Sequence, residues 1–142
     1  VDGVLVTDLT PEESGEFESE LRANGLDMIF VVAPTSTDER LKLVAQRASG
    51  FIYAVSRAGV TGAQSTVSAE AEKLVTRMRQ FSELPIAVGF GISNAEQVRD
   101  VNRYADAVVV GSAIVAEMER LEGVPDLAKR IGEFLTGLIR FT

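Results

Sequence analysis

The sequence predicts an α/β fold built from repeated parallel βα units. Two features of the sequence support this prediction. Short runs rich in Val and Ile recur along the chain, and each is followed by a stretch with helical spacing of its apolar residues. The runs are continuously apolar rather than alternating, which is typical of parallel strands covered on both faces. No linker or low-complexity segment interrupts the pattern, so residues 1–142 are expected to form a single domain.

The strands are expected at five places. The apolar runs that define them cover residues 4–6, 28–33, 51–55, 86–88 and 107–110. The first helix is expected over residues 11–23. It has Glu12 and Glu13 in its first turn, where carboxylates meet the helix dipole favourably, and Asn24 and Gly25 end it.

The remaining helices are marked by their amino-terminal caps. Thr37 is expected to cap the second helix and Ser68 the third, and either Ser93 or Asn94 the fourth, because their side-chain oxygens can accept a backbone N–H. The apolar residues expected on the inner faces of the third and fourth helices are Leu74, Val75, Met78, Val98 and Val101. After the last strand a short helix over "GSAIVAEMERLEG" is expected, and then a second helix over residues 127–141.

Two architectures fit five βα units. A flavodoxin-like doubly wound sheet would be complete at this length. A partial (β/α)8 TIM barrel, with about five of its eight units, accounts better for the short extra helix after the last strand, because barrel phosphate sites use such a helix. Val1 begins without methionine and a strand pattern is already under way, so we expect a chain cut on its amino-terminal side.

Composition excludes several classes of function. The net charge is −7 and no long basic run occurs, which argues against nucleic acid as the main partner. The chain has no Cys and no His, so thiol chemistry, a Ser-His-Asp triad and thiolate or imidazole metal sites are excluded, and no metal or cofactor is expected. No apolar run reaches the roughly 18–20 residues of a membrane span, so no membrane partner is expected. The absence of cysteine fits a reducing cytoplasm, so a cytoplasmic protein is expected.

Three strand ends are rich in glycine. They read "SRAGVTG" at 56–62, "GFGIS" at 89–93 and "GSAIV" at 111–115. In a parallel sheet all three lie at the carboxyl ends of the strands, where glycine lets the backbone approach a ligand closely. Helices begin just after the second and third of these loops, so their unpaired N–H groups are expected to point at the same region. Together with the Ser112 hydroxyl, these groups predict a phosphate site made mostly of backbone.

Other residues near this site allow two interpretations each. The loop over residues 56–66 is either a lid that closes over a ligand or a passive connection. Phe90 is either a wall of an aromatic pocket or part of the core, and Tyr53 is either a ligand contact or a packing residue. Asp8 is the one acidic residue expected at a strand end, so the chain has a phosphate anchor without a paired acid and base.

Five stretches in order resemble the tryptophan synthase alpha chain family. They are "VDGVLVTDLTPEES", "IFVVAPTSTDERL", "GFIYAVSRAGVTGA", "LPIAVGFGISNAEQV" and "ADAVVVGSAIV", and they cover nearly the whole chain. The resemblance implies the carboxyl-terminal five-eighths of a TIM barrel, from strand four to helix eight. One departure is Thr10, which stands where the family usually has proline, in a loop that the resemblance places towards the partner chain.

The resemblance implies a lyase of tryptophan biosynthesis. That family cleaves indole-3-glycerol phosphate into indole and glyceraldehyde 3-phosphate in a retro-aldol reaction, without a cofactor, and works with a tryptophan synthase beta chain in an alpha2-beta2 heterotetramer. The substrate-binding residues that it implies are Tyr53, Thr61, Gly62, Phe90, Gly91, Gly111 and Ser112, and Arg57 would join Thr61 in the closing loop.

The resemblance implies no catalytic residue within this chain. The catalytic glutamate and aspartate of the family would precede Val1, so the chain alone is expected to be inactive and, with two open sheet edges, prone to associate. Two other interpretations of the function remain. One is another phosphate-binding TIM-barrel enzyme, and the other is a non-enzymatic five-stranded binding module. The order of the strands separates a barrel from a doubly wound sheet.

Overall fold

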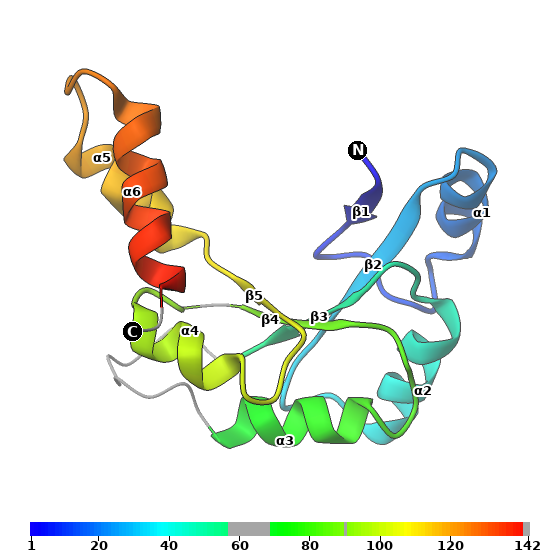
Figure 1. The fold of residues 1–142 in the computed structure, drawn as a ribbon. Coiled ribbons are helices and arrows are strands. Elements are labelled where there is room, and N and C mark those ends of the chain that lie inside the picture. Colours follow the sequence, from blue (N-terminus) through cyan, green and yellow to red (C-terminus); the bar gives the residue numbers. More distant parts are fainter. Residues whose placement is uncertain (57–68, 90, 141–142) are drawn as a thin grey trace.

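The computed structural model describes residues 1–56, 69–89 and 91–140, in which strands and helices alternate as the sequence predicts (Figure 1). The strands are β1 (Gly3–Leu5), β2 (Asp27–Val32), β3 (Ile52–Val55), β4 (Ile86–Gly89) and β5 (Ala107–Val109). The helices are α1 (Gly15–Ala23), α2 (Asp38–Arg47), α3 (Ala69–Met78), α4 (Ala95–Val101), α5 (Ser112–Arg120) and α6 (Leu127–Ile139).

The five strands form one parallel sheet in the order β1-β2-β3-β4-β5. Each strand therefore pairs with its neighbours in the sequence, and the order never reverses. A doubly wound sheet requires such a reversal, so the flavodoxin-like alternative is excluded and the barrel-type arrangement is confirmed. β1 and β5 are the two edges of the sheet, and each pairs on one side only.

The core lies on one face of the sheet. Successive side chains of a strand point to opposite faces, and alternate residues of β2, β3 and β4 join the helices in one apolar cluster. The strand members of this cluster are Met28, Phe30, Val32, Ile52, Ala54, Ile86 and Val88, all 2% exposed or less. Figure 1 shows α2, α3 and α4 gathered on this side, while the opposite face is open between β1 and the α5–α6 pair. We call this opposite side the open face.

The expected inner faces of two helices are confirmed. Leu74, Val75 and Met78 of α3 are buried, and so are Val98 and Val101 of α4. The cap of α3 was expected at Ser68, which lies outside the described residues. The expectation that α6 reaches residue 141 is wrong, because the helix ends at Ile139 and Arg140 has an extended backbone.

The first helix begins four residues later than predicted. Pro11 is buried in a turn in which the Glu13 N–H donates to the Thr10 carbonyl at 3.1 Å. The Ser14 hydroxyl also bonds to the Pro11 carbonyl at 2.9 Å, which favours the turn over another helical turn. Glu12 and Glu13 therefore precede α1, and Glu16 and Glu18 are the carboxylates in its first turn.

One carboxylate joins the residue just after helix α3 to the starts of β4 and β5. Asp106, just before β5, accepts from the Ile86 N–H at 2.8 Å and pairs with Arg79 at 2.9 Å. The hydrogen bond from the Ile86 N–H contributes most to lowering the pKa of Asp106, and Arg79 lowers this pKa further.

None of the helices in the described part of the chain has the length and the apolar character that crossing a membrane requires.

Candidate functional site

The second and third glycine-rich loops leave the sheet side by side. Gly89 of β4 is in register with Val109 of β5, and Gly91 and Gly111 each follow two residues later. Gly91 has a φ of +79°, a conformation that glycine adopts without strain. The next residue, Ile92, is buried in the core and anchors this loop to it. The register of β4 and β5 therefore places these two loops next to each other at the carboxyl ends of the strands, as predicted.

Among the helix starts after strands for which the structure describes a cap, that of α5 is the most open. Gly111 is its N-cap residue and offers no side-chain cap, and its first turn holds no acidic residue. By contrast, α1, α2 and α4 all carry glutamate or aspartate in their first turns. Gly111 and Ser112 are exposed. Because the first N–H groups of a helix have no partner within it, this end can accept an anion, and the Ser112 hydroxyl adds a further donor.

The start of α4 differs, which corrects one expectation. Its N–H groups were expected to face the ligand as well, but side chains of the chain itself accept from two N–H groups at this end, those of Ser93 and Gln97. The Asn94 side chain accepts from the Gln97 N–H at 2.9 Å, and the Gln97 side chain accepts from the Ser93 N–H at 2.8 Å. Asn94 is thus the cap of α4, and the Gln97 side chain binds the N–H of Ser93, the residue before the cap. Unlike the start of α4, the start of α5 has no side-chain cap.

Tyr53 lies on the open face and reaches across to β4. A side chain added at Gly89 would collide with the Tyr53 hydroxyl and would come within 2.7 Å of its ring carbon Cζ and 3.0 Å of Val109 Cβ. Gly89 therefore leaves the space into which the Tyr53 ring fits. Burial raises the pKa of the Tyr53 hydroxyl, so it is a neutral hydrogen-bonding group at neutral pH.

Several predicted site residues lie outside the described residues. These are Arg57, Thr61, Gly62 and Phe90. The base of the first glycine-rich loop is described, because the Ser56 N–H donates to the Gly89 carbonyl at 2.9 Å and Ser56 is buried. This bond continues the β3–β4 pairing, so the chain enters that loop directly beside the second one.

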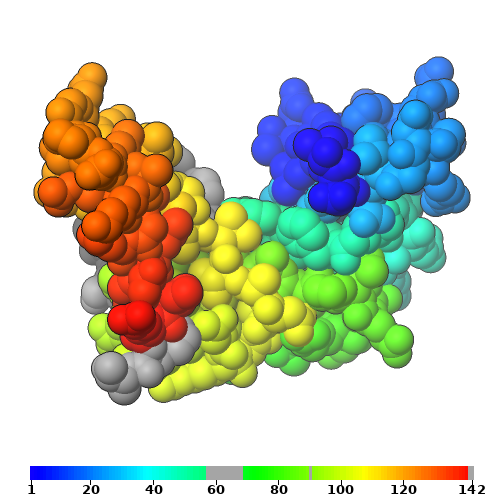
Figure 2. All heavy atoms as spheres, turned by 45° about the horizontal axis from the view of Figure 1, so that its top comes forward, coloured from blue at the N-terminus to red at the C-terminus, as the bar shows by residue number. Residues whose placement is uncertain are grey.

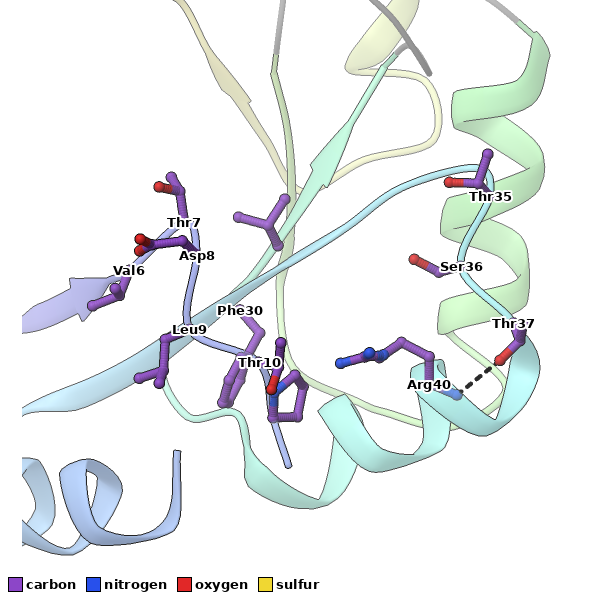
Figure 3. Close-up of a pocket in the computed structure, with 12 residues that line it drawn as sticks. Val6, Thr7, Asp8, Leu9, Thr10, Phe30, Thr35, Ser36, Thr37 and Arg40 are labelled. Atoms are coloured by element: carbon purple, nitrogen blue, oxygen red, sulfur yellow. Dashed lines mark hydrogen bonds between the residues drawn. The ribbon is translucent and has the colours of Figure 1, made fainter. Parts of the chain in front are cut away.

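A second concave region lies at the carboxyl ends of β1 and β2 (Figure 3). It is a pocket of about 490 Å³ between the loop after β1 and the start of α2. Asp8 borders it, together with hydroxyl side chains from both sides and Arg40 of α2. The polar residues that line it are Thr7, Asp8, Thr10, Thr35, Ser36, Thr37 and Arg40.

Arg40 ties the two sides of this pocket together. Its guanidinium pairs with Glu12 at 2.7 Å, and its backbone N–H donates to the Thr37 hydroxyl at 3.3 Å, which confirms Thr37 as the cap of α2 (Figure 3). Apart from Asp8, the sequence-based reasoning did not single out these residues as a site. The hydroxyl-rich run "TSTD", separated from the end of β2 by two residues, is the signal that could have pointed to them. This pocket lies at β1 and β2, whereas the predicted phosphate site lies at β3 to β5.

The sheet and its loops define a class of protein, namely a parallel βα protein of the barrel type, with glycine-rich loops and an open helix start at the carboxyl ends of its strands. The family model described as tryptophan synthase alpha chain matches residues 1–136. The chain belongs to the tryptophan synthase alpha chain family.

Curated relatives and solved structures agree with this assignment. The tryptophan synthase alpha chain of Opitutus terrae is 48% identical over 145 residues, covering 99% of this chain and 54% of the relative. That of Citrifermentans bemidjiense is 48% identical, covering 97% of this chain and 51% of the relative. A structure of the tryptophan synthase a2b2 complex from Pyrococcus furiosus matches with a TM-score of 0.86 and 34% identity, covering 97% of this chain and 55% of that one. The chain thus spans about half the length of the relatives it matches.

Proposed function

We propose that this chain forms the carboxyl-terminal portion of a tryptophan synthase alpha subunit and supplies its phosphate site. The Pyrococcus furiosus structure is described as an a2b2 complex, and by analogy we assign the chain a beta-chain partner and a cytoplasmic role in tryptophan biosynthesis. The substrate would be indole-3-glycerol phosphate. Its cleavage breaks the bond between the indole ring and the glycerol chain, releasing indole and glyceraldehyde 3-phosphate.

The observation that carries the proposal is the open start of α5 beside the Gly91 loop. The N–H groups of Ser112 and Ala113, at the start of α5, have no partner inside the helix, and no carboxylate lies in its first turn to compete with a phosphate. Gly111 and Gly91 leave room for the phosphate oxygens. Residues 61 and 62 would close over them, with Phe90 and Tyr53 beside the indole ring.

The phosphate site has a positioning role in this mechanism. Binding a group remote from the reacting carbon supplies energy that holds the scissile bond in place. The net proton movement of the cleavage runs from the glycerol hydroxyl to the indole carbon, and it requires a positioned acid and base. Asp8 follows β1, two strands away from β3, which carries Tyr53. We therefore propose that the 142-residue chain alone binds the phosphate but does not cleave the substrate.

Titration of the chain with glycerol 3-phosphate, followed by calorimetry, tests the site. Ser112→Asp places a carboxylate at the first position of α5, and we expect it to weaken phosphate binding by about tenfold or more through charge repulsion. The matched control is Ala128→Asp, which adds the same charge to the exposed first turn of α6. Equal affinities for the two variants, or no binding by the unaltered chain, would contradict the proposed site.

A further inference from the structure

One buried amide lies at the start of α4. Among the described residues, three polar residues are buried, namely Ser14, Ser56 and Gln97. Gln97 is the largest of them and lies in the first turn of α4, where it is 5% exposed. An amide loses its hydration on burial, and this costs free energy unless hydrogen bonds inside the protein replace the water. The partners of the Gln97 amide therefore show what it is buried to hold.

The Gln97 side chain holds the loop that follows β4. Its Oε1 atom accepts from the Ser93 backbone N–H at 2.8 Å and from the Ser93 hydroxyl at 3.2 Å. In a capping box, a glutamine at this helical position binds the N–H of the N-cap residue itself, which here is Asn94. In this chain the side chain reaches one residue further back. Gln97 thus binds the end of the loop rather than the first residue of its own helix.

Both residues that follow Gly91 in this loop are fixed. Ile92 is 1% exposed and belongs to the core cluster, and Ser93 is held by Gln97. Gly91 itself is exposed, and a Cβ built on it meets nothing within 4 Å. A glycine backbone has more conformational freedom to lose than any other residue. The anchored residues beside it therefore restrict where the Gly91 N–H can point.

Helix α4 gives the Gln97 side chain a firm support. Val98 and Val101 on its inner face are buried in the core cluster. Helix α6 packs against α4, and the space-filling view shows the red residues of α6 next to the yellow-green residues of α4 (Figure 2). The Asn94 side chain also accepts from the Gln97 backbone N–H. A residue that is locked in this way can hold a neighbouring loop in one geometry.

We propose that Gln97 is a positioning residue for the phosphate site, where it holds the Gly91 loop in the conformation that binds the ligand. The inference rests on the proposed function, because it takes the N–H groups of this loop and of α5 as the phosphate donors. A donor that is already ordered loses less conformational entropy when the ligand binds, and the affinity is higher for it. Gln97 acts through Ser93 and does not itself bind the phosphate.

The first experiment measures the loop without a ligand. Gln97→Met keeps the size of the side chain but removes the accepting oxygen, so amide hydrogen exchange at Ser93, followed by NMR, should become about tenfold faster or more. Gln97→Glu keeps an accepting oxygen and should retain the slow exchange of the unaltered chain. Equal exchange at Ser93 in Gln97→Met and the unaltered chain would overturn the inference, whether or not the chain binds phosphate.

The second experiment measures binding of glycerol 3-phosphate by calorimetry, at a temperature where circular dichroism shows every variant to be folded. We expect Gln97→Met to weaken binding about threefold to tenfold, the effect of one lost hydrogen bond. Asn94→Ala is the matched control, because it removes the cap of the same helical turn and leaves both contacts with Ser93 in place. Its affinity should stay within about twofold of that of the unaltered chain, although its stability falls.

The outcomes separate this inference from the proposed function. No binding by the unaltered chain contradicts the phosphate site itself and overturns the inference with it. Binding that is weakened by Ser112→Asp but unchanged in Gln97→Met overturns the inference alone. Equal losses of affinity in Asn94→Ala and Gln97→Met would assign the effect to the stability of α4 and would also overturn the inference.

Discussion

The two faces of the sheet are built from the same strands but carry different amounts of stabilising burial. Two adjacent apolar residues show this difference in burial, because Phe30 is 2% exposed whereas Val31 is 36% exposed. Phe30 points into the cluster under the helices, and Val31 points to the open face. The apolar character of a strand therefore does not reveal how much each residue contributes to stability. The contribution of each residue to stability depends on what packs against its face of the sheet.

The largest expected contrast comes from truncating one residue on each face. Ile52 is fully buried on the helix-covered face, so Ile52→Ala should lower the free energy of unfolding by about 2–5 kcal/mol, through lost burial and the cavity that remains. Val31→Ala, which removes exposed methyl groups, should cost less than about 1 kcal/mol. Urea denaturation of the two variants at a concentration where the chain is monomeric measures the difference. Similar losses would mean that the open face is as well covered as the other.

A second contrast concerns the crowded point on the open face. Gly89→Ala introduces a methyl group against the Tyr53 ring and should cost about 1–3 kcal/mol, because strand backbone on both sides limits relaxation. Tyr53→Ala in the same chain should recover most of that loss. A double-mutant cycle in urea gives the coupling between the two positions.

Gly132→Ala is the matched control for that cycle. Gly132 lies within α6, and an added Cβ there meets nothing within 4 Å, so the substitution should stabilise the chain by up to about 1 kcal/mol. Additive effects of Gly89→Ala and Tyr53→Ala would show that the two residues do not compete for space.

The smallest effect is a pH dependence on the helix-covered side. The pKa of Asp106 is lowered in the folded chain, so its contribution to stability is complete above its ordinary pKa of 3.8 and is lost as the pH falls through the lowered value. Asp106→Asn should therefore flatten the fall in thermal stability below about pH 4. Arg79→Ala removes one of the two partners of Asp106 and should flatten it less. If thermal stability fell with pH in Asp106→Asn as it does in the unaltered chain, other groups would be responsible for the acid dependence.

Much of the fold follows from the sequence because runs of β-branched residues, and glycines at the ends of strands and helices, are local signals. The ends of the five strands are predicted to within one residue, and Thr37 is correctly predicted as a cap. The start of α1 was misplaced because the pattern at Glu12 and Glu13 fits a helix equally well. The bond from Ser14 to the Pro11 carbonyl, which favours a turn there, is not visible in apolar spacing.

The site was less predictable because its parts come from different strands. The closed start of α4 had a sequence signal, since Asn94 and Gln97 have the spacing of a capping box. The contact of Tyr53 with Gly89 had none, because it depends on the register between β3 and β4. The proposed ligand roles of Thr61, Gly62 and Phe90 stay predictions.

The sequential order of the strands has a consequence for how the chain acquires its structure. Paired residues such as Gly3 and Asp27, or Ala87 and Ala107, are close in the sequence, and each pairing among the described strands joins consecutive strands. Each step closes a short loop, which costs little chain entropy. A chain emerging from the ribosome can therefore add one strand and one helix at a time to a growing edge, and assembly can proceed before synthesis ends.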